Sequence, residues 1–280
     1  MPARRFEKQL RQLYSSLNRR EYVHPDPLEF LYAYDDIEDR EIVGLVASCL
    51  AYGNVKQILR SVSTVLERIP SPRAFVLDST RSSLEATCKD FKHRFTTGQE
   101  LATMLFGVKQ VIKTHGSLYS CFSHEYQDNH ETIVPALSAL VRELSSVFNS
   151  RPRSLLPPPS AGSACKRLNL YLRWMVRSDA VDPGGWHDIP ASKLIVPVDR
   201  HMHDISLKLG ITKRKQADLK TAIEITEAFR AVEPNDPVRF DFCLTRLGIR
   251  DDGNPEEFIR LCKSNDRERT CTFANDSQGS

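Results

Sequence analysis

Apolar residues recur every three to four positions along most of the chain, which is the spacing of one face of an α-helix. Residues 5–18 show this spacing at Phe6, Leu10, Leu13 and Leu17. We therefore predict an all-α protein. Residues 42–51 are apolar nearly all round, as expected for a buried helix that begins at Asp39. Further helices are predicted at 55–69, 72–78, 81–90, 98–114, 116–127, 131–148, 163–177, 200–209, 215–232, 237–247 and 255–263.

Several helix boundaries have recognisable capping residues. Ser163 is expected to cap the start of helix 163–177, and Asp236-Pro237 has the form of an N-cap followed by a first-turn proline. Gly210 and Gly248 stand where helices commonly end.

Residues 151–160, RPRSLLPPPS, form a proline-rich connector, because three consecutive prolines favour an extended and rigid backbone. We predict a single domain over 1–262, made of one helical lobe at about 39–150 and a second from 1–38 plus 160–262, with a cleft between them. The polar, aperiodic tail, 263–280, is predicted to be disordered.

The net charge of the 280 residues is only +3, but basic residues are concentrated in one region. Between 151 and 215 there are 12 lysines and arginines against 5 aspartates and glutamates, a local net charge of +7. Such a region suits a polyanionic partner such as a nucleic acid.

The seven cysteines show no C-x-x-C spacing, so neither a disulfide framework nor a zinc or iron–sulfur site is indicated, and we expect no metal and no cofactor. The first 13 residues are charged rather than apolar, and the longest apolar run, 42–52, has 11 residues. We therefore expect a cytoplasmic protein without a membrane span.

Lys166 is the first candidate for chemistry. A cap at Ser163 would put it at the third helical position, beside unpaired N–H groups and the positive end of the helix dipole. This field disfavours an ammonium ion and increases the neutral fraction that can act as a nucleophile. The alternative is an ordinary solvated lysine. Arg167, Arg173 and Arg177 add positive potential along the same helix.

Asp199 follows an apolar run and precedes helix 200–209, where it would serve as an N-cap. A carboxylate fixed in this way stays ionised and aimed, so it could also stabilise developing positive charge. His201 and His203 fall in the first turn of that helix and are either surface residues or phosphate contacts.

These segments resemble the helix-hairpin-helix DNA glycosylase superfamily, in particular the glycosylase/lyase members that act on oxidised purines. Residues 162–166, GSACK, are similar to the G-x-G-x-K segment that carries the nucleophilic lysine, with the second glycine replaced. Residues 197–202, PVDRHM, are similar to the P-V-D-x-H-M segment that carries the catalytic aspartate. The resemblance implies that Lys166 is the nucleophile, that Asp199 stabilises charge and that His201 contacts backbone phosphate.

Residues 48–55 resemble the helix-loop-helix from which the superfamily inserts an amide side chain into the gap left by a flipped base. Asn54 is the first candidate for this role and Tyr52 the second, and a simple interhelical turn at Gly53-Asn54 is the alternative. The other candidate DNA contacts are Gly162, Ser163, Arg167 and Trp186, which lies in a Gly-Gly loop.

The whole chain is also similar to a little-characterised family of bacterial proteins of unknown function, whose motif runs through Lys166 to Ile249. It departs from the glycosylase pattern in two places. A proline-rich segment replaces the L-P-G-x-G hairpin, and Asp199 lies 33 positions after Lys166, a long spacing that implies an extra loop around Trp186.

We therefore predict a monomeric DNA repair enzyme that excises a damaged base, such as an oxidised purine, through a lysine Schiff base and cleaves the abasic site. Damaged duplex DNA is the expected partner, and RNA stays open as another. The alternatives are a nucleic-acid-binding protein without turnover and a helical protein-interaction module.

Overall fold

The computed structural model describes residues 2–149, 154–249 and 253–264, and within these ranges the protein is all-α apart from one small hairpin. The α-helices are α1 (Glu7–Leu17), α2 (Ile37–Cys49), α3 (Val55–Arg68), α4 (Pro72–Asp78), α5 (Arg81–Cys88), α6 (Gly98–His115), α7 (Leu118–Glu125), α8 (Val134–Ser145), α9 (Lys166–Val176), α10 (Arg200–Lys208), α11 (Leu219–Arg230) and α12 (Asp241–Ile249). Short 3-10 helices are η1 (Pro2–Phe6), η2 (Arg20–Tyr22), η3 (Pro27–Ala33), η4 (Pro159–Ala161) and η5 (Ala191–Lys193). Among the described residues, none of the helices combines the length and apolar character that a membrane span requires.

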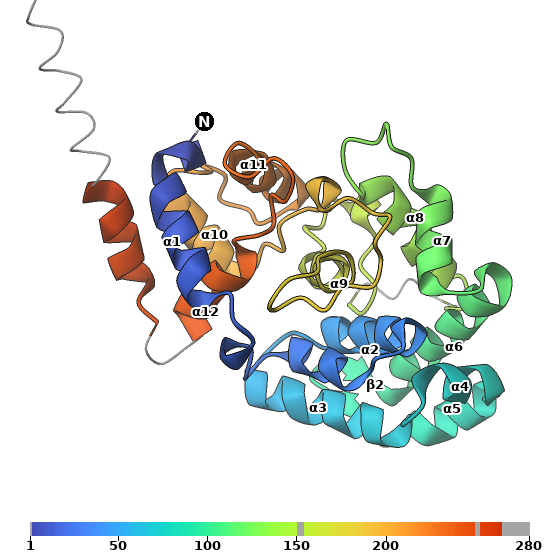
Figure 1. Cartoon of the computed structure of the whole chain (residues 1–280). Helices are drawn as coiled ribbons and strands as arrows, with labels where there is room; N and C mark the ends of the chain where they lie inside the picture. The colour runs from blue at the N-terminus through green and yellow to red at the C-terminus, as the bar shows by residue number, and fades with distance from the viewer. Residues whose placement is uncertain (1, 150–153, 250–252, 265–280) are drawn as a thin grey trace, which may run out of the picture.

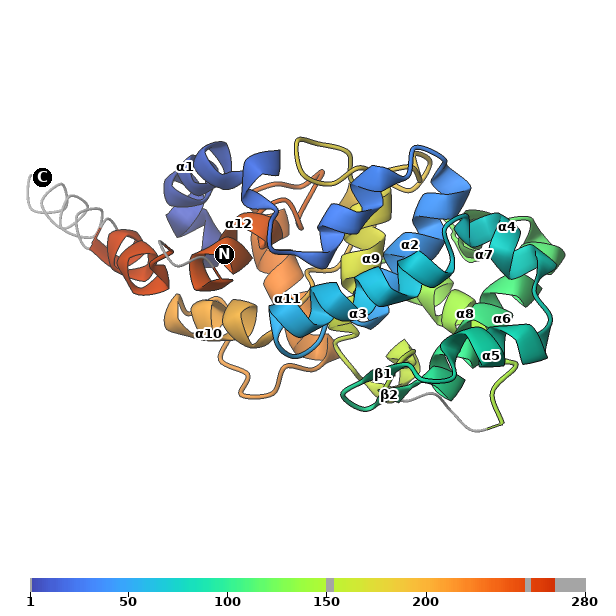
Figure 2. The same ribbon diagram turned by 90° about the horizontal axis from the view of Figure 1, so that it is seen from below.

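Helix α9 lies between two groups of helices (Figure 1). One group contains α1, α10, α11 and α12, and the other contains α2 to α8; Figure 2 shows them at the two ends of an elongated molecule. The buried apolar side chains nevertheless form one continuous core that includes residues of both groups. The division into two lobes therefore stays a prediction.

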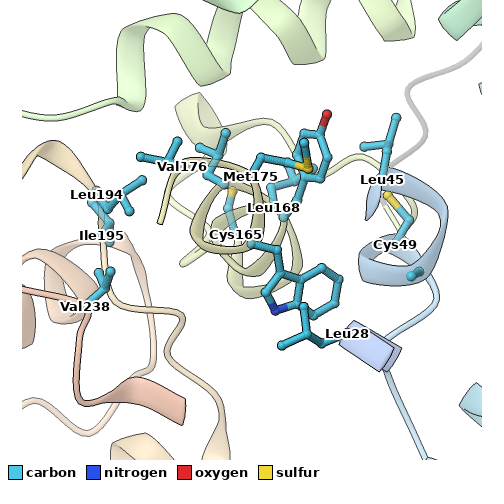
Figure 3. Close-up of a cluster of buried hydrophobic side chains, with 14 of the residues drawn as sticks. Leu28, Leu45, Cys49, Cys165, Leu168, Met175, Val176, Leu194, Ile195 and Val238 are labelled. Carbon is cyan, nitrogen blue, oxygen red and sulfur yellow. The ribbon is translucent and has the colours of Figure 1, made fainter. Parts of the chain in front are cut away.

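The central position of α9 follows from its sequence, because apolar residues occupy nearly every face of the helix. Leu168, Leu172 and Met175 are at most 1% exposed. Figure 3 shows the α9 side chains between Leu45 and Cys49 of α2 on one side and a second apolar group on the other. Burying each large aliphatic side chain stabilises the fold by about 1.5–3 kcal/mol. The core therefore fixes the helix whose first residue is Lys166.

Some helix boundaries differ from the sequence expectations. Helix α2 begins earlier than predicted, since the carboxylate of Asp36, not Asp39, accepts the N–H groups of residues 38 and 39. Helix α12 begins later, at Asp241, because Asp236 pairs with Arg177 instead of capping. Gly248 lies inside α12, whereas Gly210 follows α10 with a left-handed φ of +67°.

A two-stranded antiparallel hairpin, β1 (Lys92–His93) and β2 (Thr96–Thr97), joins α5 to α6. Figure 2 draws it below α3. Its inward side chains, His93 and Thr96, are buried, whereas Phe95 at the tip is 73% exposed. The hairpin thus holds an apolar side chain out into solvent.

Where it is described, the predicted connector is extended at Pro158, with φ −71° and ψ 131°, but it packs against the core instead of standing apart as a spacer. Leu155 and Leu156 are fully buried, and Pro159 begins η4. Residues 151–153 lie outside the described residues. The last described helix, at 255–264, extends two residues into the predicted tail, and 265–280 lie outside the described residues.

Candidate functional site

A cleft of about 880 Å³ opens between α9, α10, α12 and the loop that joins α2 to α3. It is lined by Lys166 and Asp199, with His201, Tyr52, Asn54 and Arg167 around them. A smaller cleft of about 410 Å³ adjoins it and is lined by Ser163 together with Tyr52, Lys166 and Arg167. Most of the residues singled out in the sequence are thus brought to one surface.

Lys166 is the first residue of α9, not the third helical residue as predicted. The capping position belongs to Cys165, which has the left-handed φ of +46°, and the hydroxyl of Ser163 accepts the N–H of Cys165 at 3.2 Å. Lys166 therefore still lies at the helix end whose N–H groups lack intrahelical partners. Its side chain is half-buried against the cleft.

The turn before α9 depends on Gly162, whose φ of +78° favours glycine. Its carbonyl accepts the N–H of Leu219 at 2.9 Å, which ties the turn to the start of α11. Gly162 is exposed and does not line the main cleft.

Asp199 caps α10 as predicted. Its carboxylate accepts the N–H of Met202 at 2.9 Å, and the preceding residues, 194–198, are buried. The cap fixes the half-buried carboxylate at the wall of the cleft that Lys166 also lines.

His201 is exposed in the first turn of α10, next to Gly248 of α12. A Cβ at residue 248 would lie 2.8 Å from Nδ1 of His201, closer than real Cβ atoms approach. The role of Gly248 is therefore not to end a helix but to leave room for the imidazole.

Tyr52 and Asn54 both line the cleft, but their side chains differ in how firmly they are held. The Tyr52 hydroxyl donates to the His93 carbonyl at 2.7 Å and accepts the Thr96 N–H at 3.1 Å. Tyr52 is thereby anchored to the hairpin. Asn54 is exposed and caps α3, accepting the N–H of Lys56 at 3.0 Å.

Arg167 ties parts of the fold together. Its guanidinium donates to the carbonyls of Cys49 and Ser154 and lies 4.8 Å above the ring of Tyr52. These contacts use both terminal nitrogens, so Arg167 positions the wall of the cleft.

The expectation that Trp186 contacts a ligand is wrong in this structure. Trp186 is fully buried, with its ring 5.3 Å from Phe122 and 5.4 Å from Tyr171. The backbone N–H of Trp186 donates to the carbonyl of Met175 at 2.8 Å, so the loop folds back onto α9. The indole is part of the core because its large apolar surface is stabilised by burial.

The model of a protein family of unknown function, DUF2400, matches residues 26–250 of the chain. The chain belongs to the DUF2400 family. No curated protein and no solved structure matches it.

The cleft of this DUF2400 protein also contains charged residues that sequence reasoning did not single out as site residues. Arg173 pairs with Asp182 at 3.1 Å and with Asp241, and Arg246 pairs with Asp26 at 2.6 Å. Asp241 lies between two phenylalanines in the sequence. A charged residue within an apolar run is rarely buried without a partner, so this pattern could have identified Asp241 as a candidate site residue. Arg173 lies about two turns after Lys166, on the same face of α9.

The hairpin tip was also missed. Arg94 lines the main cleft and Phe95 lines the adjoining one. Arg94 has a left-handed φ of +51°, and its side chain packs so closely on Gly53 that a Cβ there would lie 2.7 Å from Cδ of Arg94. The tip is therefore held against the loop that carries Asn54.

Proposed function

We propose that this DUF2400 protein is a DNA glycosylase with abasic-site lyase activity, built on a helix-hairpin-helix glycosylase-like arrangement. One observation carries the proposal: Lys166 and Asp199, the first residue of one helix and the cap of another, line the same cleft. The cleft is within the size range of ligand pockets, about 300–1,000 Å³.

The two residues have complementary tasks in this reaction. When the bond between C1′ and the base breaks, positive charge develops on the sugar, and the fixed carboxylate of Asp199 stabilises it. The neutral amine of Lys166 forms a bond to C1′ as the base leaves with the bonding electrons. The C1′–O4′ bond of the sugar ring then breaks, a proton passes from nitrogen to O4′, and a Schiff base results. That intermediate permits β-elimination of the 3′ phosphate.

The rim of the cleft suits a nucleic acid whose target nucleotide is turned out of the stack. Arg94 and Arg200 are exposed at the cleft and carry positive charge toward a phosphate backbone. Because Tyr52 is anchored by its hydroxyl, the exposed side chains of Asn54 and Phe95 are better placed to enter the gap that the flipped nucleotide leaves.

Borohydride trapping tests the proposal. The protein is incubated with a DNA duplex that contains one abasic site, and the reduced adduct is resolved on a denaturing gel. We expect an adduct for the wild type and none for Lys166→Gln. Lys220→Gln is the matched control, since Lys220 is an exposed lysine in the first turn of α11 and does not line the cleft.

An undiminished adduct with Lys166→Gln would refute the assignment of the nucleophile. Salt-dependent duplex binding without an adduct in the wild type would instead favour a binding protein without turnover.

A further inference from the structure

Asp241 is a buried carboxyl group at the first position of α12, where it lines the cleft together with Lys166 and Asp199. It is 2% exposed. One carboxylate oxygen, Oδ2, accepts from Arg173, whereas Oδ1 is buried without a hydrogen-bond partner among the described residues. A buried polar atom without a partner is costly, so its retention needs a reason.

Asp241 belongs to a buried network in which carboxyl groups outnumber the guanidinium groups that pair with them. Two buried guanidinium groups, on Arg173 and Arg177, pair with four carboxyl groups. These are Asp179, Asp182, Asp236 and Asp241. With all six ionised, the network would carry two excess negative charges in a medium of low dielectric constant. Taking up a proton at Asp241 relieves part of this excess.

Charged groups from each neighbouring element line the cleft together with Asp241. They include Lys166 and Arg173 on α9, Asp199 before α10, Arg246 on α12 and Asp26 before η3, which pairs with Arg246. Burial raises the pKa of Asp241 to about 6, Arg173 and Lys166 oppose the shift, and Asp199 adds to it. A carboxyl group of this kind can exchange protons near neutral pH.

We propose that Asp241 is the proton donor for Schiff-base formation at Lys166, an inference that rests on the proposed lyase function. The neutral amine of Lys166 adds to the C1′ aldehyde of the ring-opened abasic sugar, and after proton transfer from nitrogen to oxygen a neutral carbinolamine forms. Asp241 then gives its proton to the carbinolamine hydroxyl, the C–O bond breaks and water leaves. The products are a positively charged iminium on Lys166, an ionised Asp241 and one water molecule.

The resulting charges fit the surroundings of the site. The iminium forms next to a carboxylate that has just become ionised, and Arg173 already donates to the other oxygen of that carboxylate. The pair of charges stabilises the intermediate, because opposite charges attract strongly where water is excluded. Asp199 keeps its position as the cap of α10, where it accepts the N–H of Met202.

The pH dependence of trapping tests this role. Adduct formation with an abasic-site duplex is monitored by cyanoborohydride reduction from below the ordinary pKa of a carboxyl group to above that of a lysine. We expect a bell-shaped profile for the wild type, because the reaction needs a neutral lysine and a protonated Asp241. For Asp241→Asn we expect a rate about 100-fold lower at the wild-type optimum and a profile that rises with pH without a descending limb.

Two variants separate proton donation from a structural effect. Asp241→Glu restores a carboxyl group and should restore the descending limb. Asp182→Asn removes another buried partner of Arg173 that lies outside the cleft. Thermal unfolding shows how much of this variant is folded, and the folded protein should keep the bell-shaped pH profile of adduct formation.

An unchanged rate and profile for Asp241→Asn would overturn the inference and leave the lyase proposal intact. A lower rate with an unchanged bell shape would also overturn it, because that result indicates a structural role. Absence of a wild-type adduct would overturn the lyase proposal and this inference together.

Discussion

The two ends of α9 use basic side chains in different ways. Lys166 at the first turn is half-buried at the cleft. Arg173 in the second half and Arg177 directly after the helix are at most 4% exposed and pair with carboxylates. The sequence suggested one positively charged helix. The structure shows that the arginine charges are neutralised within the fold, so only the first turn offers a basic group to a ligand.

The comparison therefore assigns two tasks to one helix. The second half holds the loop at 178–186 and the start of α12 in place, and the first turn presents the amine. Substitutions of Arg173 or Arg177 should lower the free energy of unfolding. Substitutions at the cleft should weaken DNA binding or slow the reaction while the protein stays folded.

The largest effect is expected for Arg177→Met. This change leaves Asp179, Asp182 and Asp236 without their shared partner, and breaking a buried ion pair costs about 3–5 kcal/mol of unfolding free energy. Urea unfolding measures it. Lys166→Gln should change the unfolding free energy by less than about 0.5 kcal/mol. Equal losses for the two variants would remove the distinction between the two ends.

Phe95→Ala should weaken binding to an abasic-site duplex by about 1–3 kcal/mol, because an aromatic side chain that stacks on bases contributes this much. Fluorescence anisotropy at fixed salt measures the affinity. Leu261→Ala is the control, since Leu261 is also an exposed apolar residue, at 50%, but lies on the last described helix. If both variants bind like the wild type, the hairpin tip is not part of the interface.

Gly248→Ala should displace His201 and reduce duplex affinity by about 1 kcal/mol, the size of one hydrogen bond. The free energy of unfolding should not decrease by the same amount, because alanine is a better helix former than glycine by about 0.8–1.0 kcal/mol. A double-mutant cycle with His201→Ala is the check. Strictly additive losses would show that Gly248 does not act through His201.

The smallest effect concerns Asn54, which both caps α3 and faces the cleft. Asn54→Ala should cost about 1 kcal/mol of stability, and Asn54→Ser should recover most of it, since serine is also a good cap. Both variants should bind the duplex more weakly than the wild type, because neither has the amide side chain. Full affinity for Asn54→Ser would mean that the residue serves the helix alone.

Most of the helices could be predicted from sequence because their apolar residues repeat with the helical period over two turns or more. The hairpin could not, because strands of two residues show no period. The start of α12 was misplaced because Asp236, a good capping residue, is taken by Arg177, 59 residues away. Local rules do not reveal such long-range pairs.

The candidate site was predictable to a similar degree. Lys166 and Asp199 were identified from their places at two helix starts, and they line the same cleft. Trp186 was misread because a tryptophan in a glycine-rich loop gives no sign of whether the loop folds inward. Asp241 was missed because its partner, Arg173, is 68 residues away, and its importance depends on that contact.

The central claim is that Lys166 is the amine that attacks an abasic sugar, and the most direct measurement is to locate the covalent bond. Wild-type protein is trapped on an abasic-site duplex with borohydride, digested and analysed by tandem mass spectrometry. The account predicts that the reduced sugar fragment is attached to Nζ of Lys166. Attachment to another lysine, or scattered attachment over exposed lysines such as Lys220, would contradict it.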